Sequence, residues 1–100
     1  MQKSNYFIIQ RTGKEITKKS VPGYIVKEDR TGLIYGVRRV NNLWQVTELS
    51  TGLLCSKSSD NINQMNKIGD YIKKISGQVK ELLKARPELK KRLENAPELA

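Results

Sequence analysis

The chain of 100 residues carries 19 lysines and arginines against 10 aspartates and glutamates, which leaves a formal net charge of +9. This length predicts a single domain, residues 1–100, with a small core that needs no disulfide or metal. Histidine is absent and cysteine occurs once, which excludes Ser-His-Asp and Cys-His catalytic groups and the usual zinc sites. The positive charge favours phosphate backbones or acidic protein surfaces as partners, and it also improves solubility.

Residues 1–57 are predicted to form an antiparallel β-meander of about six strands. Three Thr-Gly pairs end at Gly13, Gly32 and Gly52, about 20 residues apart. Each glycine suits a hairpin turn, because glycine adopts positive φ without steric cost. The spacing is compatible with simple turns in a meander and with an internal duplication. We expect the strands over Asn5–Gln10, Glu15–Ser20, Tyr24–Glu28, Leu33–Val40 and the two arms of Leu43–Leu54.

Proline is expected to separate the second and third of these strands at Val21-Pro22-Gly23, since it donates no hydrogen bond to a β ladder. The lysines around Glu15–Ser20 suit an edge strand, because charge on an open edge opposes aggregation. In the central hairpin, alternation with period two places Trp44, Val46 and Glu48 on one face.

An amphipathic helix is predicted over about residues 60–86, where apolar side chains recur at spacings of three and four. Its apolar face consists of Ile62, Met65, Ile68, Ile72, Ile75, Val79 and Leu82. Ser58-Ser59-Asp60 supplies favoured N-cap residues, and Pro87 ends the helix because it moves the preceding residue out of the α region. Gly77 lies inside this run, so one bent helix and two helices divided near Ser76-Gly77 both remain open.

A short second helix is predicted to begin at Pro87-Glu88, since proline is preset for the first helical position. Asn95-Ala96-Pro97 ends it, and Glu98-Leu99-Ala100 is expected to fray. A sheet with one exposed face needs its other face covered, and the long helix is the available cover. The fold class is therefore predicted as α+β, with a β-meander in residues 1–57 and a helical part in residues 58–100.

Cys55 is predicted to be a small core or partly buried residue, because it falls on a strand and has no second cysteine to pair with. A reactive thiol is the alternative. The first apolar run, Tyr6–Ile9, is too short for a signal peptide or a membrane span. We therefore expect a cytoplasmic protein that makes no contact with a membrane.

Signatures of catalysis, metal binding and cofactor binding are missing from the sequence. Glu28-Asp29 suits a turn, and Glu48 is expected to face a basic neighbour across the sheet. No Asp-rich loop suits calcium or magnesium, and no Gly-rich loop suits a phosphate. We expect a non-enzymatic protein without a cofactor.

Basic residues are the better candidates for a functional surface. Arg38-Arg39, with Tyr35 and Trp44 nearby, combine guanidinium groups with rings that can stack on a base. The alternative is that both rings lie in the core and the arginines are solvated. The lysines of the long helix form a stripe opposite its apolar face. The candidate partner-binding residues are Arg38, Arg39, Lys73, Lys74, Lys80, Lys84, Arg86, Lys90, Lys91 and Arg92.

The run Trp44–Leu53, WQVTELSTGL, follows Tyr35-Gly36-Val37 and resembles a pattern in small proteins of phages and mobile elements from Gram-positive bacteria. The resemblance covers about Ile34–Leu54, and the Lys-, Asn- and Ile-rich composition is similar to that of low-GC phage sequences. Some of these proteins inhibit host enzymes or defence systems, anti-CRISPR proteins among them. The resemblance therefore implies an inhibitor acting in the host bacterial cytoplasm, and it assigns no functional residues.

Two functions follow from charge and resemblance together. The first is binding of nucleic acid or of a nucleoprotein through the positive surface. The second is inhibition of a host nuclease or defence complex, with the positive surface placed on an acidic protein surface. Binding to DNA or RNA at low salt separates these two hypotheses. The sequence leaves the oligomeric state open, a homo-oligomer included.

Overall fold

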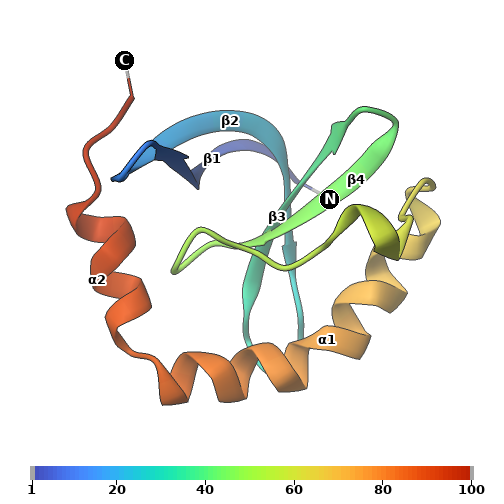
Figure 1. Cartoon of the computed structure of the whole chain (residues 1–100). Coiled ribbons are helices and arrows are strands. Elements are labelled where there is room, and N and C mark those ends of the chain that lie inside the picture. The colour runs from blue at the N-terminus through green and yellow to red at the C-terminus, as the bar shows by residue number, and fades with distance from the viewer. Residues whose placement is uncertain (1, 100) are drawn as a thin grey trace.

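Five antiparallel strands form one curled sheet, in the order β1-β2-β3-β4-β5, within residues 2–99, which the computed structural model describes. The strands are β1 (Gln2–Thr12), β2 (Glu15–Lys27), β3 (Ile34–Val40), β4 (Leu43–Glu48) and β5 (Leu53–Leu54). A 3-10 turn at Ser58–Asp60 precedes the helices α1 (Asn66–Ala85) and α2 (Glu88–Asn95). The sheet curls until β1 contacts β5, and α1 runs below it in the view of Figure 1. The predicted α+β class and the antiparallel meander are confirmed.

The count of five strands corrects the prediction of six, because Pro22 does not end the second strand. β2 pairs with β1 over residues 15–25 and with β3 over residues 24–27. Lys18 directs its backbone N–H and carbonyl away from β1, toward the C-terminal segment. Alternate residues of a strand direct these groups to the same side, so the nitrogen of Pro22 also points away from β1. No bond to β1 is lost there, and the predicted break is wrong.

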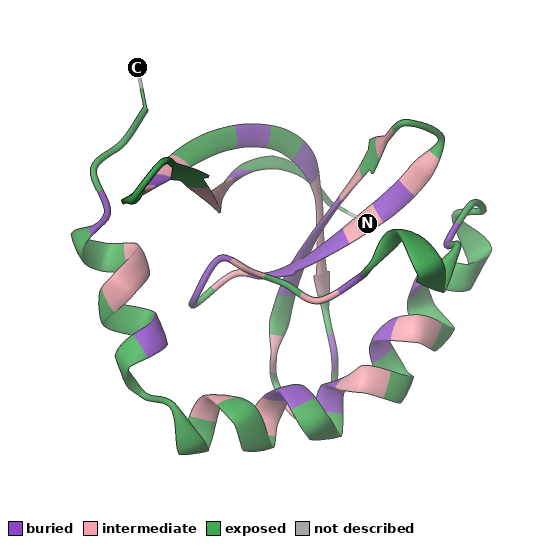
Figure 2. Ribbon diagram, in the orientation of Figure 1, coloured by how far each residue is buried: buried purple, intermediate pink, exposed green. Residues whose placement is uncertain are grey.

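The main core lies between the sheet and α1, whose buried residues face the sheet while its outer side is exposed (Figure 2). Trp44, Val46 and Glu48 are all buried, and Thr47 on the opposite face of β4 is buried as well. The hydroxyl groups of Tyr35 and Ser76 lie 2.8 Å apart and link β3 to the middle of α1. The buried apolar residues of this core are Tyr35, Val37, Trp44, Val46, Ile62, Ile68 and Ile72.

The long helix begins later than predicted, because the chain before it is held against the sheet. Asp60 accepts a hydrogen bond of 2.7 Å from the backbone N–H of Lys57 and closes the 3-10 turn. The carbonyl of Ile62 then accepts a bond of 2.7 Å from the backbone N–H of Trp44 in β4. Ile62 therefore fills the core from the segment before the helix, and the predicted helix start near residue 60 is wrong.

The second helix begins and ends as the prolines predicted, and the residues after it pack against the β1–β2 hairpin. The backbone N–H of Lys18 bonds the carbonyl of Pro97 at 3.0 Å, and the N–H of Leu99 bonds the carbonyl of Lys18 at 2.8 Å. The second predicted strand is therefore covered at Lys18 and is not an open edge. The predicted fraying is wrong for Glu98 and Leu99, and Ala100 lies outside the described residues.

Candidate binding cleft

Two turns of the sheet share one sequence pattern and one hydrogen-bond pattern. Residues 28–33 (EDRTGL) and residues 48–53 (ELSTGL) each begin with a buried glutamate. In each turn the carboxylate accepts hydrogen bonds from the backbone N–H two residues later and from the threonine hydroxyl three residues later. The glycine takes positive φ, and its N–H bonds the glutamate carbonyl at 2.9 Å. We name these segments the first and the second Glu-turn.

The two glutamates differ in their charged neighbours. Arg30 lies 3.9 Å from the Glu28 carboxylate, whereas Glu48 forms no salt bridge within the described part of the chain. Glu48 is 1% exposed and accepts bonds from Ser50 N–H, Ser50 Oγ and Thr51 Oγ1 at 2.7–2.8 Å. The expectation that Glu48 faces a basic neighbour across the sheet is therefore wrong, since its own turn supplies its partners.

The first Glu-turn also holds a low-pKa carboxyl group. The backbone N–H of Arg30 bonds the Glu28 carboxylate at 2.9 Å and is the main reason that the pKa of Glu28 lies below its usual range. The hydroxyl and the N–H of Thr31 lower that pKa further. A carboxylate held by several donors stays ionised and fixes the shape of its turn.

Helix α1 is held against the first Glu-turn near its middle. The Arg30 guanidinium donates a bond of 3.1 Å to the carbonyl of Lys73, and Ser76 Oγ donates one of 2.6 Å to the carbonyl of Ile72. Such extra donors at helix carbonyls are associated with bending, and α1 curves around the sheet (Figure 1). The helix runs unbroken through Gly77, so the single-helix alternative is confirmed.

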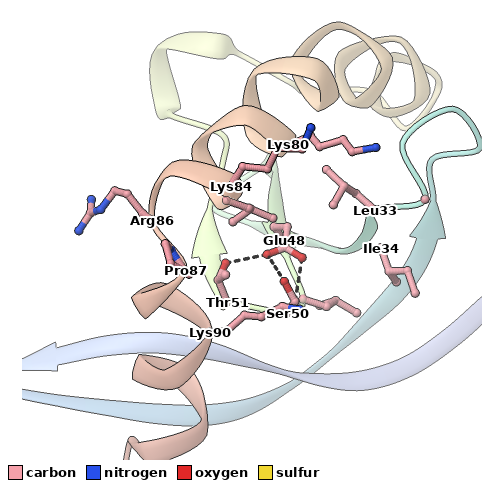
Figure 3. Close-up of a pocket in the computed structure, with 13 residues that line it drawn as sticks. Leu33, Ile34, Glu48, Ser50, Thr51, Lys80, Lys84, Arg86, Pro87 and Lys90 are labelled. Carbon is pink, nitrogen blue, oxygen red and sulfur yellow. Dashed lines mark hydrogen bonds between the residues drawn. The ribbon is translucent and has the colours of Figure 1, made fainter.

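A cleft of about 670 Å³ opens between the two Glu-turns, the second half of α1 and the start of α2. Its apolar lining consists of Leu33, Ile34, Leu49, Leu83 and Pro87. Glu48, bonded to Ser50 and Thr51, lies at its base (Figure 3). The lining contains no aromatic residue among those that the structure describes.

Three lysines surround this cleft: Lys80 and Lys84 from α1, and Lys90 from α2. We name them the rim lysines. Lys80 extends toward Leu33 on the other side of the cleft, whereas Arg86 points away from it (Figure 3). Two rim lysines, at positions 80 and 90, form no ion pair with any carboxylate in residues 2–99, and Lys84 lies 3.7 Å from an exposed glutamate. The rim therefore presents ammonium groups that are available to an outside anion.

The structure brings together four of the ten candidate partner-binding residues, namely Lys80, Lys84, Arg86 and Lys90. Arg86 is paired with Glu88 at 2.9 Å. The remaining residues of the two helices lie outside the cleft: Lys73, Lys74 and Lys91 are exposed, and Arg92 is half-buried. The helical half of the candidate set thus includes one coherent site and several separate cations.

Arg38 and Arg39 lie on opposite faces of β3, and both aromatic rings are buried. Arg39 is exposed and is the register partner of Trp44 in β4. Tyr35 is completely buried and Trp44 is 9% exposed, so the alternative that both rings lie in the core is confirmed. Neighbouring strand residues point to opposite faces, and Arg38 accordingly lies on the other side of the sheet from Tyr35, against Gly23. Tyr35 therefore presents no exposed face to a base in this structure, and Trp44 presents little.

The apolar half of the cleft was not anticipated from the sequence. Leu33 and Leu49 belong to the two Glu-turns, and Leu83 lies on α1 outside the predicted apolar face of that helix. The one available signal was the repeated pattern E-x-x-T-G-L, which marks two similar turns. That signal does not show that the turns lie side by side.

Cys55 is partly buried, and burial raises the pKa of its thiol to about 11. The thiolate, which is the reactive form, is scarce at neutral pH, and this supports the prediction of a packing role. Neither helix in residues 2–99 has the length and the apolar character to cross a bilayer. The same residues contain no cluster of three or more acidic or cysteine side chains that would hold a metal ion.

No protein-family model, no curated protein and no solved structure matches the chain. The cleft, with its apolar lining and its rim lysines, is therefore the feature of this structure from which a function can be inferred.

Proposed function

We propose that this protein is a non-enzymatic binding protein whose cleft takes an acidic segment of a partner protein. The observation that carries the proposal is the position of the rim lysines around an apolar cleft, two of them without a carboxylate partner in the described residues. Opposite charges attract over several ångströms in solution and favour encounter. Apolar lining then adds affinity, because it is removed from water when a segment covers it.

A protein segment suits this cleft better than a nucleic acid does. Base recognition in single strands depends on aromatic side chains that stack on the bases. Tyr35 and Trp44 are buried, and the described lining of the cleft contains no aromatic ring. Phosphate contacts through exposed lysines outside the cleft remain the second candidate function, supported by Lys73, Lys74 and Lys91, which carry no salt bridge within residues 2–99.

The resemblance to small phage proteins supports a particular partner class. Enzymes that cut nucleic acid carry carboxylates in their metal sites, and a cationic protein can compete for such an acidic surface. We therefore propose a host nuclease or defence complex as the partner, with inhibition as the result. The opposite charge complementarity, in which an acidic protein imitates DNA, is excluded by the net charge of +9.

A titration at low salt tests this function with poly-L-glutamate and with a duplex DNA as probes. Replacing the rim lysines together (Lys80→Gln, Lys84→Gln and Lys90→Gln) is expected to weaken binding of polyglutamate roughly tenfold, from three exposed ion pairs. The matched control replaces three exposed lysines of β1, β2 and their turn: Lys3→Gln, Lys14→Gln and Lys19→Gln.

Equal weakening in both triple variants would show general attraction without a site, and the proposal would be wrong. Tighter binding of DNA, with log affinity falling against log salt at a slope near −4.5 for about five phosphate contacts, would favour the second candidate. Binding of neither probe would contradict both functions.

A further inference from the structure

The cleft imposes an order on any ligand that enters it, because its base and its rim carry opposite charges. Glu48 lies at the base and is 1% exposed. Three donors from its own turn hold it as a fixed acceptor. A ligand carboxylate placed beside it would be buried next to a like charge, which is strongly unfavourable. The rim lysines, by contrast, lie where a carboxylate can remain partly in water.

The apolar lining lies between Glu48 at the base of the cleft and the lysines at its rim. Leu33, Leu49 and Leu83 enter the cleft from three different elements, and Ile34 beside them is 42% exposed. The volume, about 670 Å³, falls in the range of about 300–1,000 Å³ typical of ligand pockets. An apolar group fits the deep part of such a site, and an anionic group fits its mouth.

The rim lysines also indicate how many anionic groups the ligand carries. Lys80 and Lys84 come from α1, and Lys90 comes from α2. A single carboxylate at the mouth of the cleft would pair with the lysines of one helix only. Two carboxylates, one on each side of an apolar group, would pair with the lysines of both helices.

From these observations we propose that the cleft takes one apolar side chain of a partner segment, leucine-like in size, with carboxylates on both flanks. This inference rests on the proposed function and specifies its ligand. An acidic segment without an apolar residue would pair with the rim lysines but would leave the apolar lining exposed to water. A single-headed amphiphile, such as a fatty acid, satisfies the lining and only part of the rim.

Two short peptides of equal charge test the apolar requirement. One carries leucine between two pairs of glutamates, and the other carries serine in its place. Burial of one leucine side chain is expected to make the leucine peptide bind roughly tenfold more tightly, or better. Isothermal titration at low salt measures both affinities.

A matched pair of variants locates the effect. Ile34→Ser removes an apolar side chain from the cleft, and it is exposed enough that the fold tolerates the change. Leu54→Ser removes one of similar exposure, 53%, that does not line the cleft. The preference for leucine is expected to shrink several-fold in Ile34→Ser and to persist in Leu54→Ser, with the fluorescence of buried Trp44 confirming the fold of each.

Equal binding of the two peptides by the unchanged protein would overturn this inference and leave the proposed function intact, since the lysines would still hold the glutamates. Equal loss of the preference in both variants would place the apolar contact elsewhere and would also overturn it. Tighter binding of octanoate than of the leucine peptide would show that the ligand of the cleft is a single-headed amphiphile, and it would overturn this inference. Binding of neither peptide would contradict the proposed function itself.

Discussion

The first and the second Glu-turn use the same residue types for the same hydrogen bonds, yet their surroundings differ. In the first, the space beside Gly32 is open, and Arg30 extends to α1. In the second, Gly52 lies under Ile9, and Thr51 is 1% exposed. The first Glu-turn is an exposed turn that contacts a helix, whereas the second is a packed part of the interior.

This comparison separates local from tertiary causes of structure. The bonds that close each turn are made within six residues, by a glutamate, a threonine and a glycine. The third Thr-Gly pair, at Thr12-Gly13, has isoleucine where the other two have glutamate, and it forms a plain hairpin turn. The same local turn can therefore be peripheral or central, depending on what the rest of the chain places against it.

The largest expected difference between the two turns concerns their glycines. Both have positive φ, +74° at Gly32 and +68° at Gly52, so alanine at either position is strained by about 1–2 kcal/mol. An alanine Cβ at Gly52 would also lie 2.9 Å from Ile9 Cγ1 and 3.2 Å from Leu93 Cδ1. We expect Gly52→Ala to lower the free energy of unfolding by about 2–4 kcal/mol. Urea denaturation measures both variants, and equal losses would contradict the assigned packing.

A smaller difference is expected at the threonines. Thr51 Oγ1 donates to Glu48 at 2.7 Å and accepts the N–H of Leu53 at 3.2 Å. Thr51→Val removes a donor from the Glu48 carboxylate and the acceptor of the Leu53 N–H. It is expected to lower the free energy of unfolding by about 1–3 kcal/mol. Thr31→Val should cost less, since Thr31 is half-buried and its own N–H still bonds Glu28.

Thr12→Val is the matched control for these threonine variants, because Thr12 is exposed and has Ile9 at the position of the glutamate in the two Glu-turns. It is expected to change the free energy of unfolding by less than about 0.5 kcal/mol. A larger loss in Thr12→Val than in Thr51→Val would show that the threonine–glutamate bond does not stabilise the turn.

The smallest effect is a pH dependence in the first Glu-turn. The pKa of Glu28 is lowered in the folded chain, first by the N–H of Arg30 and then by Thr31. A carboxyl group whose folded pKa is depressed contributes stability at neutral pH, and this contribution is lost as pH falls through the folded value.

Thr31→Val should raise the pKa of Glu28, and Arg30→Ala should raise it less, because the guanidinium is exposed and 3.9 Å away. Carbon-13 NMR titration of the carboxyl group measures both shifts, and an unchanged pKa in Thr31→Val would contradict the assigned bond.

Much of the secondary structure could be predicted because it depends on short-range patterns. The turn glycines, the alternation at Trp44, Val46 and Glu48, and the prolines around α2 are all local features, and the structure agrees with each. The effect of Pro22 could not be predicted in this way, because it depends on which strand edge the proline nitrogen faces. That side is set by the register with β1 and by the position of the C-terminal segment.

The candidate site could be predicted only in part. Lys80, Lys84 and Lys90 were among the candidate residues because cations on a predicted helix are visible in the sequence. Leu33 and Leu49 were not, since at least 16 residues of sequence separate them from α1 and they become neighbours of the lysines only in the folded chain.

The amino-acid sequence by itself determined the meander with its Thr-Gly turns, the two helices and the cationic character, because turns, periodicity and charge act over a few residues. The tertiary structure alone decided that α1 begins at Asn66 and that Trp44 is buried. It also decided that Glu48 lies at the bottom of a cleft whose rim carries lysines. Each of these depends on hydrogen bonds or packing between segments far apart in the chain, such as the bond from Trp44 to Ile62. The physical reason is that burial and register are properties of the whole curled sheet with its helices, and no single segment of it contains them.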